Sequence, residues 1–152
     1  MVPRMSVVCF TARPGGLDVL LTGLSHQRFD DFELVLVDAL YNRRKELVAD
    51  LCHQARISVQ HIPPRTRNFP YEGIPEACNA AIAKARGQLL LFVVDFSFLP
   101  PRCLSEHWGV FEAMNYERAG IGAHLYLDPP AMVFPIPDYA PIKTETQSDR
   151  EV

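Results

Sequence analysis

The sequence predicts an α/β domain in which helices cover a mostly parallel sheet. Short apolar runs rich in β-branched residues alternate with segments whose apolar residues recur at helical spacing. This strand–helix–strand alternation implies right-handed crossovers between parallel strands. The chain has 152 residues, of which 48% are hydrophobic and 22% are charged, and this is the profile of one globular domain with a real core.

The first strand and the first helix are the clearest elements. The run M-S-V-V-C-F-T over residues 5–11 is apolar and β-branched, and A-R-P-G-G closes it. The next segment carries leucines at i, i+3, i+4 and i+7, which form one face of a helix: Leu17, Leu20, Leu21 and Leu24. We therefore expect a strand followed by a helix packed against the sheet.

A second strand, a second helix and a third strand follow in the same order. The run E-L-V-L-V over residues 33–37 predicts a strand that ends on Asp38. Residues 57–62 predict the third strand, which Pro63 and Pro64 halt. Five residues between these strands are expected on the buried face of a helix: Leu47, Val48, Leu51, Cys52 and Ala55.

The second half of the chain begins with an irregular loop, R-T-R-N-F-P-Y-E-G-I-P. The loop opens a helix expected over Glu76–Ala85, with Pro75 near its first turn. Residues 89–94 predict a fourth strand, buried on both faces. A helix through about Met114 follows Pro101, and residues 120–127 are expected to make one more strand.

Proline dominates the chain after residue 127. The segment D-P-P-A-M-V-F-P-I-P-D-Y-A-P-I-K lacks many backbone donors and has fixed φ angles, so we expect an extended segment lying on the domain. The last residues, T-E-T-Q-S-D-R-E-V, are polar and expected to fray. We therefore divide the chain into a domain over residues 1–127 and a proline-rich tail over 128–152.

Charge and composition exclude several classes of function. The net charge of −3 and the pI near 5.9 do not suggest nucleic-acid binding. No G-x-G-x-x-G follows the first strand and no Walker A pattern occurs, which argues against a dinucleotide enzyme and a P-loop enzyme. The five histidines lack metal-ligand spacing and are interpreted as surface or helix residues. The four scattered cysteines are expected to be free, and mostly buried, thiols.

Neither a signal peptide nor a membrane span is expected. The first residues, M-V-P-R-M-S, lack a long apolar stretch, and no segment approaches the roughly 20 apolar residues of a span. Together with the free thiols, this favours a location in the reducing cytoplasm.

Polar residues stand at the predicted carboxyl ends of three strands, where parallel sheets bind ligands. These residues are Thr11, Asp38 and Asp95. Asp38 has a second interpretation, because an aspartate also caps a turn by bonding its own backbone two residues on. Asp95, in F-V-V-D-F-S-F-L-P-P, is too far from the helix after Pro101 to cap it, so a ligand-facing role is favoured.

The chain resembles the family-2 glycosyltransferases, which have the GT-A fold. The segment S-V-V-C-F-T-A-R followed by L-L-T-G-L-S-H-Q-R-F-D-D-F-E-L-V-L-V-D is similar to the opening of that family. The segment G-I-P-E-A-C-N-A-A-I-A-K-A-R-G-Q-L-L-L-F-V-V-D resembles a later part, with the spacing from Gly73 to Asn79 and Asp95 preserved. The resemblance covers approximately residues 5–115.

The resemblance implies a Rossmann-like GT-A domain that binds a nucleotide-diphosphate sugar and Mg²⁺ or Mn²⁺. Asp95 would be the metal-holding carboxylate, since hard cations prefer oxygen ligands. The donor, expected to be a UDP-sugar, would lie along six residues: Thr11, Ala12, Arg13, Asp38, Gly73 and Asn79. Taken alone, Asn79 is expected to face solvent. The sugar would be transferred to an acceptor that the sequence does not identify.

The sequence departs from the family at several positions. Ala39 replaces the second aspartate of the V-D-D pattern, and Cys78 replaces the arginine of A-R-N. The metal motif is reduced to D-F-S, with Ser97 as a weak second ligand. The family normally continues with an acceptor-binding half, most of which we expect this chain to lack, so a partner chain, an oligomer or the proline-rich tail would have to complete the acceptor side. We assign no catalytic base.

Three hypotheses follow from these observations. The first is a metal-assisted glycosyltransferase. The second is a non-catalytic GT-A-like binding or regulatory domain that has lost its transferase activity. The third is a general βαβ domain that resembles the family only in architecture, because a fold does not fix a function.

Overall fold

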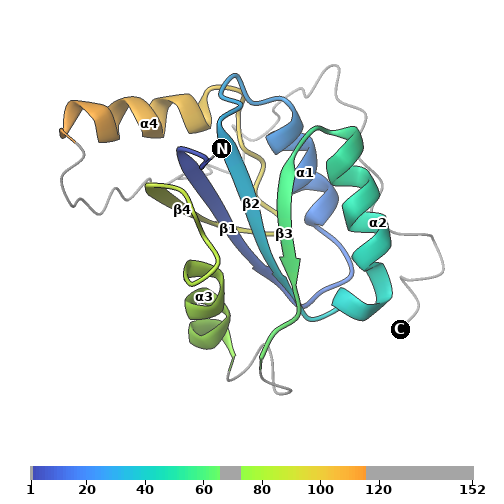
Figure 1. The fold of residues 1–152 in the computed structure, drawn as a ribbon. Coiled ribbons are helices and arrows are strands. Elements are labelled where there is room, and N and C mark those ends of the chain that lie inside the picture. Colours follow the sequence, from blue (N-terminus) through green and yellow to red (C-terminus); the bar gives the residue numbers. More distant parts are fainter. Residues whose placement is uncertain (1, 66–72, 116–152) are drawn as a thin grey trace, which may run out of the picture.

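The structure, a computed structural model, describes residues 2–65 and 73–115. In this part of the chain, strands and helices alternate without interruption (Figure 1). The strands are β1 (Met5–Thr11), β2 (Phe32–Asp38), β3 (Ser58–Ile62) and β4 (Leu89–Val94). The helices are α1 (Leu17–Ser25), α2 (Tyr41–Gln54), α3 (Ile74–Ile82) and α4 (Cys103–Ala113).

The four strands form one sheet in the order β3-β2-β1-β4, and all neighbouring strands are parallel. From β1 the chain builds outward in one direction through β2 and β3, and it then crosses to the other side of β1 to form β4. The chain direction therefore switches between β1 and β4, and in sheets of this kind ligands bind outside the carboxyl ends of the strands at such a switch point. This arrangement confirms an α/β fold with a parallel sheet flanked by helices, an architecture that is also found in Rossmann-like folds.

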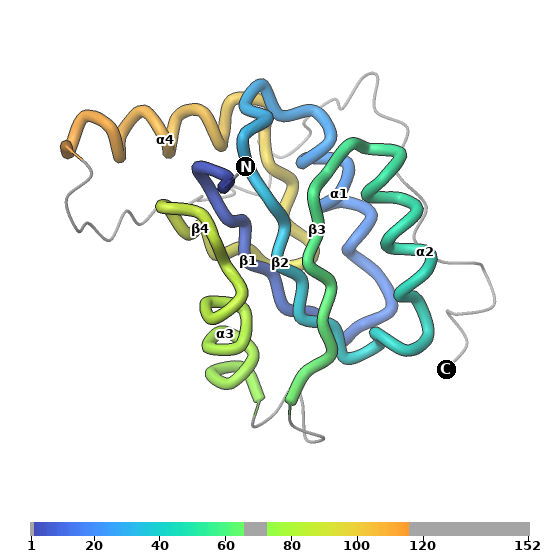
Figure 2. The backbone as a smooth tube through the Cα atoms, in the orientation of Figure 1, coloured from blue at the N-terminus to red at the C-terminus, as the bar shows by residue number. Residues whose placement is uncertain are grey.

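The helices cover the two faces of the sheet unequally. On one face, α1, α2 and α4 pack against alternate residues of β1 and β2 and form the larger core. On the other face, α3 contributes Ala77 and Ala81 to a smaller core with Val8, Val35 and Val37. Figure 2 shows α3 and the pair α1–α2 on opposite sides of the strands. The small side chains of α3 let it approach the sheet closely.

The first helix buries the face that its leucine spacing predicts. Leu17, Leu20, Leu21 and Leu24 are all buried in the larger core. Burying each leucine stabilises the fold by about 1.5–3 kcal/mol relative to leaving it exposed. The bounds of β1 and β4 also match the apolar runs in the sequence, because each run fills one strand.

Three details of the sequence prediction are wrong. Leu47 is 38% exposed, and the buried face of α2 instead contains Arg44, Val48 and Cys52. The third helix ends at Ile82 rather than at Ala85, because the Lys84 amide bonds Ala81 three residues back, at 3.0 Å. The fourth strand is not buried on both faces, since α3 packs mainly on β1 and β2.

A buried carboxylate joins β2 to the crossover between α3 and β4. Glu33 accepts hydrogen bonds from the Ser6 hydroxyl at 2.8 Å and from Gln60 at 3.0 Å. Its partner Arg86 binds it through the backbone amide at 2.8 Å and through Nε at 2.9 Å. Glu33 therefore ties the start of β4 to β1, β2 and β3 at the amino-terminal edge of the sheet.

Several expectations fall on residues outside the described part. These are the strand over residues 120–127, the boundary at residue 127 and the tail over 128–152. Among the helices of residues 2–65 and 73–115, none has the length and apolar character needed to cross a membrane.

Candidate functional site

The sheet brings the three strand-end residues to one edge. Thr11 ends β1, Asp38 ends β2, and Asp95 directly follows β4. Thr11 and Asp38 lie opposite one another in the β1–β2 register. In each strand, alternate side chains face α1 and α2, and these three residues belong to that set. All three are buried. The predicted meeting of these residues at the carboxyl edge of the sheet is therefore observed.

Asp95 and Thr11 contact one another directly across the switch point. The Thr11 hydroxyl donates a hydrogen bond of 2.6 Å to Oδ2 of Asp95. Asp95 is only 3% exposed, so its charge needs a partner. Arg13 provides this partner, with its Nε 3.2 Å from the same oxygen. Among the described residues, no hydrogen bond reaches the other carboxylate oxygen, Oδ1.

Arg13 connects the buried carboxylate to solvent. Its side chain is 59% exposed, and its guanidinium lies 4.8 Å from the ring centroid of Phe96. A guanidinium has five N–H donors in a fixed fork, and the ion pair to Asp95 engages Nε. The remaining donors suit a bidentate anion such as a phosphate.

The loop that carries Arg13 is shaped by glycine and packs against Asp95. Gly16, which precedes α1, has a φ of 99°, a conformation that side chains other than glycine rarely adopt. A Cβ on Gly16 would lie 3.4 Å from the carbonyl carbon of Asp95. At Gly15, no atom of the described residues lies within 4 Å of such a Cβ. The turn thus places the start of α1 beside the candidate site.

Gln27 fixes the connection that leaves Asp95. Its amide nitrogen donates to the carbonyls of Leu99 at 3.0 Å and Pro100 at 2.8 Å. Its carbonyl oxygen accepts the backbone amide of Leu104 at 3.0 Å, at the start of α4. Gln27 therefore holds the middle of the segment between Asp95 and α4, together with the start of α4.

Asp38 has a different environment, because its two oxygens are occupied by protein groups. Arg44 binds it in a bidentate manner, with Nε at 2.8 Å from Oδ2 and Nη2 at 3.0 Å from Oδ1. His61 donates from Nε2 to Oδ2 at 2.9 Å. The amide of Leu40 donates to Oδ1 at 2.8 Å. The turn-capping interpretation of Asp38 is thus confirmed, together with a buried ion pair.

These contacts set the charge of Asp38. Burial alone would raise the pKa of Asp38, but the hydrogen bonds from His61 and Arg44 hold it below its ordinary value. The carboxylate therefore stays ionised at neutral pH. Burial raises the pKa of the neighbouring Cys9 thiol, and the charges of Asp95 and Asp38 raise it further. Cys9 is consequently a neutral core thiol and not a nucleophile.

The sequence analysis missed two residues of this cluster. Arg44 was not singled out, and His61 was interpreted as a surface or helix residue. His61 instead lies on β3 with a 6% exposed side chain, packed edge-on against Tyr41 at 4.8 Å. Within residues 2–65 and 73–115, no group forms a hydrogen bond with its Nδ1. In the register of β2 and β3, His61 pairs with Leu36, two residues before the level of Asp38, and sequence spacing alone does not give this register.

The remaining predicted donor-binding residues are placed as follows. Ala12 lies between Thr11 and Arg13 in the loop after β1 and is partly buried. Gly73 is buried at the start of α3, and Asn79 is exposed on the same helix. These two residues belong to α3 and its first turn, which pack on the opposite face of the sheet from the side chains of Thr11 and Asp95.

The described residues provide one carboxylate for a cation. They contain no cluster of three His, Cys, Asp or Glu side chains that could hold a metal ion. A single carboxylate is nevertheless sufficient for Mg²⁺ when substrate phosphates and water supply the other ligands. The donor set therefore suits a cation that arrives with a phosphate group, with Oδ1 of Asp95 as its protein ligand.

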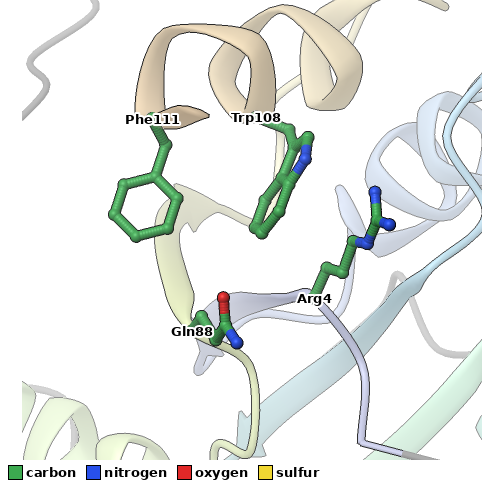
Figure 3. Close-up of a pocket in the computed structure, with 4 residues that line it drawn as sticks. All are labelled: Arg4, Gln88, Trp108 and Phe111. Atoms are coloured by element: carbon green, nitrogen blue, oxygen red, sulfur yellow. The ribbon is translucent and has the colours of Figure 1, made fainter. Parts of the chain in front are cut away.

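A separate pocket lies at the opposite, amino-terminal edge of the sheet. Its volume is about 690 Å³, and it is lined by Arg4, Gln88, Trp108 and Phe111 (Figure 3). Arg4 precedes β1 and Gln88 precedes β4, while the two rings come from α4. The guanidinium of Arg4 lies 5.3 Å from the Trp108 ring centroid. This pocket shares no residue with the Thr11–Asp95 cluster.

Comparisons with known proteins do not identify a family. No protein-family model matches the chain, and no curated protein matches it.

Proposed function

We propose that the chain is a nucleotide-sugar-binding domain that transfers a sugar from a nucleotide-diphosphate donor to an acceptor. The expected donor is a UDP-sugar, and the expected fold is the GT-A variant of the Rossmann-like class. One observation carries the proposal: Thr11, Arg13 and Asp95 meet at the switch point of a parallel sheet, beside a glycine turn. In open parallel sheets, ligands usually bind at the switch point, outside the carboxyl ends of the strands.

The proposed roles follow from the chemistry of the leaving group. Departure of the sugar puts negative charge on the diphosphate, and a bound Mg²⁺ or Mn²⁺ would stabilise that charge. Asp95 would hold the cation through Oδ1, and Arg13 would contact the phosphates. Thr11 keeps the Asp95 carboxylate in place. Asp38 would act indirectly, because its oxygens are bound to Arg44 and His61.

A second function is favoured by the neutralised carboxylates. Asp38 is saturated by protein donors, and Asp95 already has a cationic partner in Arg13. A domain with this arrangement can bind a nucleotide without catalysing transfer. The alternative proposal is therefore a non-catalytic binding or regulatory domain with the same fold.

The first experiment is a thermal melt of the whole chain with UDP and Mn²⁺. A ligand that binds only the native state stabilises it by about 2.7 kcal/mol at one hundred times its Kd. We expect a higher Tm for the natural chain and no increase for Asp95→Asn, which keeps the size of the side chain and its bond with Thr11. Arg102→Gln, on the exposed surface of the α4 region, is the control and should retain the increase.

The outcomes separate the hypotheses. If no nucleoside diphosphate raises the Tm, both nucleotide-binding hypotheses are contradicted, and only the architectural resemblance to the family stands. A raised Tm without release of sugar from any of a panel of nucleotide-sugars would favour the non-catalytic domain. An Asp95→Asn variant that still responds to UDP and Mn²⁺ would contradict the assignment of the cation to Asp95.

A further inference from the structure

Three large apolar side chains are exposed on β4 and just after its end. Phe92 is 47% exposed, Val94 is 39% exposed and Phe96 is 54% exposed. We call these three residues the β4 patch. Single exposed apolar residues are ordinary, but successive side chains on one face of a parallel strand are not, because such strands are normally covered on both faces.

The strand register shows which face is bare. Phe92 lies opposite Val8 and Val94 lies opposite Phe10, so these side chains point to the same side as their partners in β1. Val8 packs against Ala77 and Ala81 of α3. Phe92 and Val94 therefore continue the α3 face of the sheet, beyond the part that α3 mainly covers, and Phe96 follows them directly after the strand.

The outer edge of β4 is also unpaired within the described part of the chain. β4 is the last strand in the order β3-β2-β1-β4, so one side of its backbone has no neighbouring strand there. Its sequence, L-L-L-F-V-V, contains no charge, proline or glycine. Natural proteins protect edge strands with such residues or cover the edge. The composition of β4 is that of a covered strand.

The chain itself contains a segment suited to this position. Residues 121–127 read I-G-A-H-L-Y-L and contain no Asp, Glu, Lys or Arg. The sequence predicts a strand in this segment. The last described helix, α4, ends on the β4 side of the sheet (Figure 1). From its end, residues 116–119 can span about 13 Å. An extended segment of eight residues then covers about 26 Å, more than the roughly 20 Å of six-residue β4.

We propose that residues 120–127 of the same chain cover the β4 patch and hydrogen-bond with the free edge of β4. A tethered segment has an effective concentration in the millimolar range, which favours it over a second copy at ordinary protein concentrations. Phe96 also contacts Arg13, so this segment would border the candidate site at its open side. The proposal does not depend on the proposed function.

Hydrogen exchange of the natural full-length chain tests the proposal directly. In a parallel pair, alternate amides of β4 face β1 and the others face the free edge. We expect the outward amides of β4 and the amides of residues 120–127 to exchange slowly together, in a chain that sediments as a monomer. Exchange of residues 120–127 at the rate of an unfolded peptide would overturn the proposal.

A substitution outside the described domain provides the second arm. Leu125→Asp places a charge where an apolar contact is required, and we expect at least tenfold faster exchange of the outward β4 amides, with self-association of the exposed edge. Thr144→Asp, in the polar end of the chain, is the matched control and should change neither. Unchanged β4 exchange in Leu125→Asp would contradict the proposal, and so would a natural chain whose β4 protection requires dimerisation.

Discussion

Two strand-end carboxylates that look alike in the sequence have different partners in the structure. Asp38 binds a buried arginine, a buried histidine and a backbone amide. Asp95 binds a threonine and an arginine that reaches solvent. Water and ligands can therefore compete for the partner of Asp95 but not for the partner of Asp38. At this scale Asp38 is a structural residue and Asp95 is the candidate for ligand contact.

The buried pair predicts a large effect of Arg44→Leu on stability. Removing this partner leaves Asp38 charged and buried, and breaking a buried pair costs about 3–5 kcal/mol. Urea unfolding followed by circular dichroism measures the loss. Arg102→Leu is the matched control, because it breaks an exposed i,i+4 pair with Glu106, and such pairs contribute about 0.3–0.5 kcal/mol. Equal effects of the two substitutions would contradict the structural role of Asp38.

The positions of these carboxylates were predictable, but their partners were not. A strand end is a local feature, since an apolar run stops at a polar residue, and this feature located Asp38 and Asp95. The partners depend on which strands and helices become neighbours. Arg44 comes from the first turns of α2, and His61 comes from the adjacent strand β3. Sequence spacing alone gave no reason to connect Asp38 with His61.

At the scale of elements, two glycines inside helices have different surroundings: one is closely packed and the other is not. Gly23 in α1 lies against the connection between β4 and α4, and a Cβ there would be 2.7 Å from the backbone nitrogen of Leu99. For Gly109 in α4, the described part of the chain places no atom within 4 Å of such a Cβ. The first glycine permits a close approach of backbone to helix, whereas the second has no packing role.

The two glycines predict opposite effects of the same substitution. Gly109→Ala should stabilise the chain by about 0.5–1 kcal/mol, because alanine loses less conformational freedom in a helix. Gly23→Ala should destabilise it by about 1–3 kcal/mol, because the overlap with Leu99 exceeds that gain. Urea unfolding of both variants checks the signs. A stabilised Gly23→Ala would show that the connection after Asp95 does not pack against α1 as described.

The bounds of the elements were predicted more reliably than the faces that they bury. Strand β1 and helix α1 follow from local runs and leucine spacing, and both have the expected residues. Leu47 and Phe92 were expected to be buried, but each is exposed. Burial depends on where the neighbouring layer of helices ends. On its face of the sheet, α3 covers mainly β1 and β2. This information lies in the packing and not in the periodicity.

At the scale of the whole molecule, buried carboxylates hold both ends of β2. Glu33 at the amino-terminal end binds Arg86, and Asp38 at the carboxyl-terminal end binds Arg44. Burial alone would raise the pKa of each, but hydrogen bonds lower both: those from Arg86 and Ser6 for Glu33, and those from His61 and Arg44 for Asp38. Ionised groups thus fix β2 to α2 and β3 at its carboxyl end, and to the crossover between α3 and β4 at its amino-terminal end.

This arrangement predicts that acid destabilises the fold. A carboxyl whose folded pKa lies below its unfolded value contributes stability above the unfolded pKa, about 3.9 for Asp and 4.3 for Glu, and loses it as the pH falls through the folded value. The free energy of unfolding in urea should therefore be constant near neutral pH and fall below about pH 4. In Glu33→Gln, which cannot ionise at this position, the chain should be less stable at pH 7 but should lose less stability on acidification. An equally steep acid dependence in Glu33→Gln would show that other groups cause the loss.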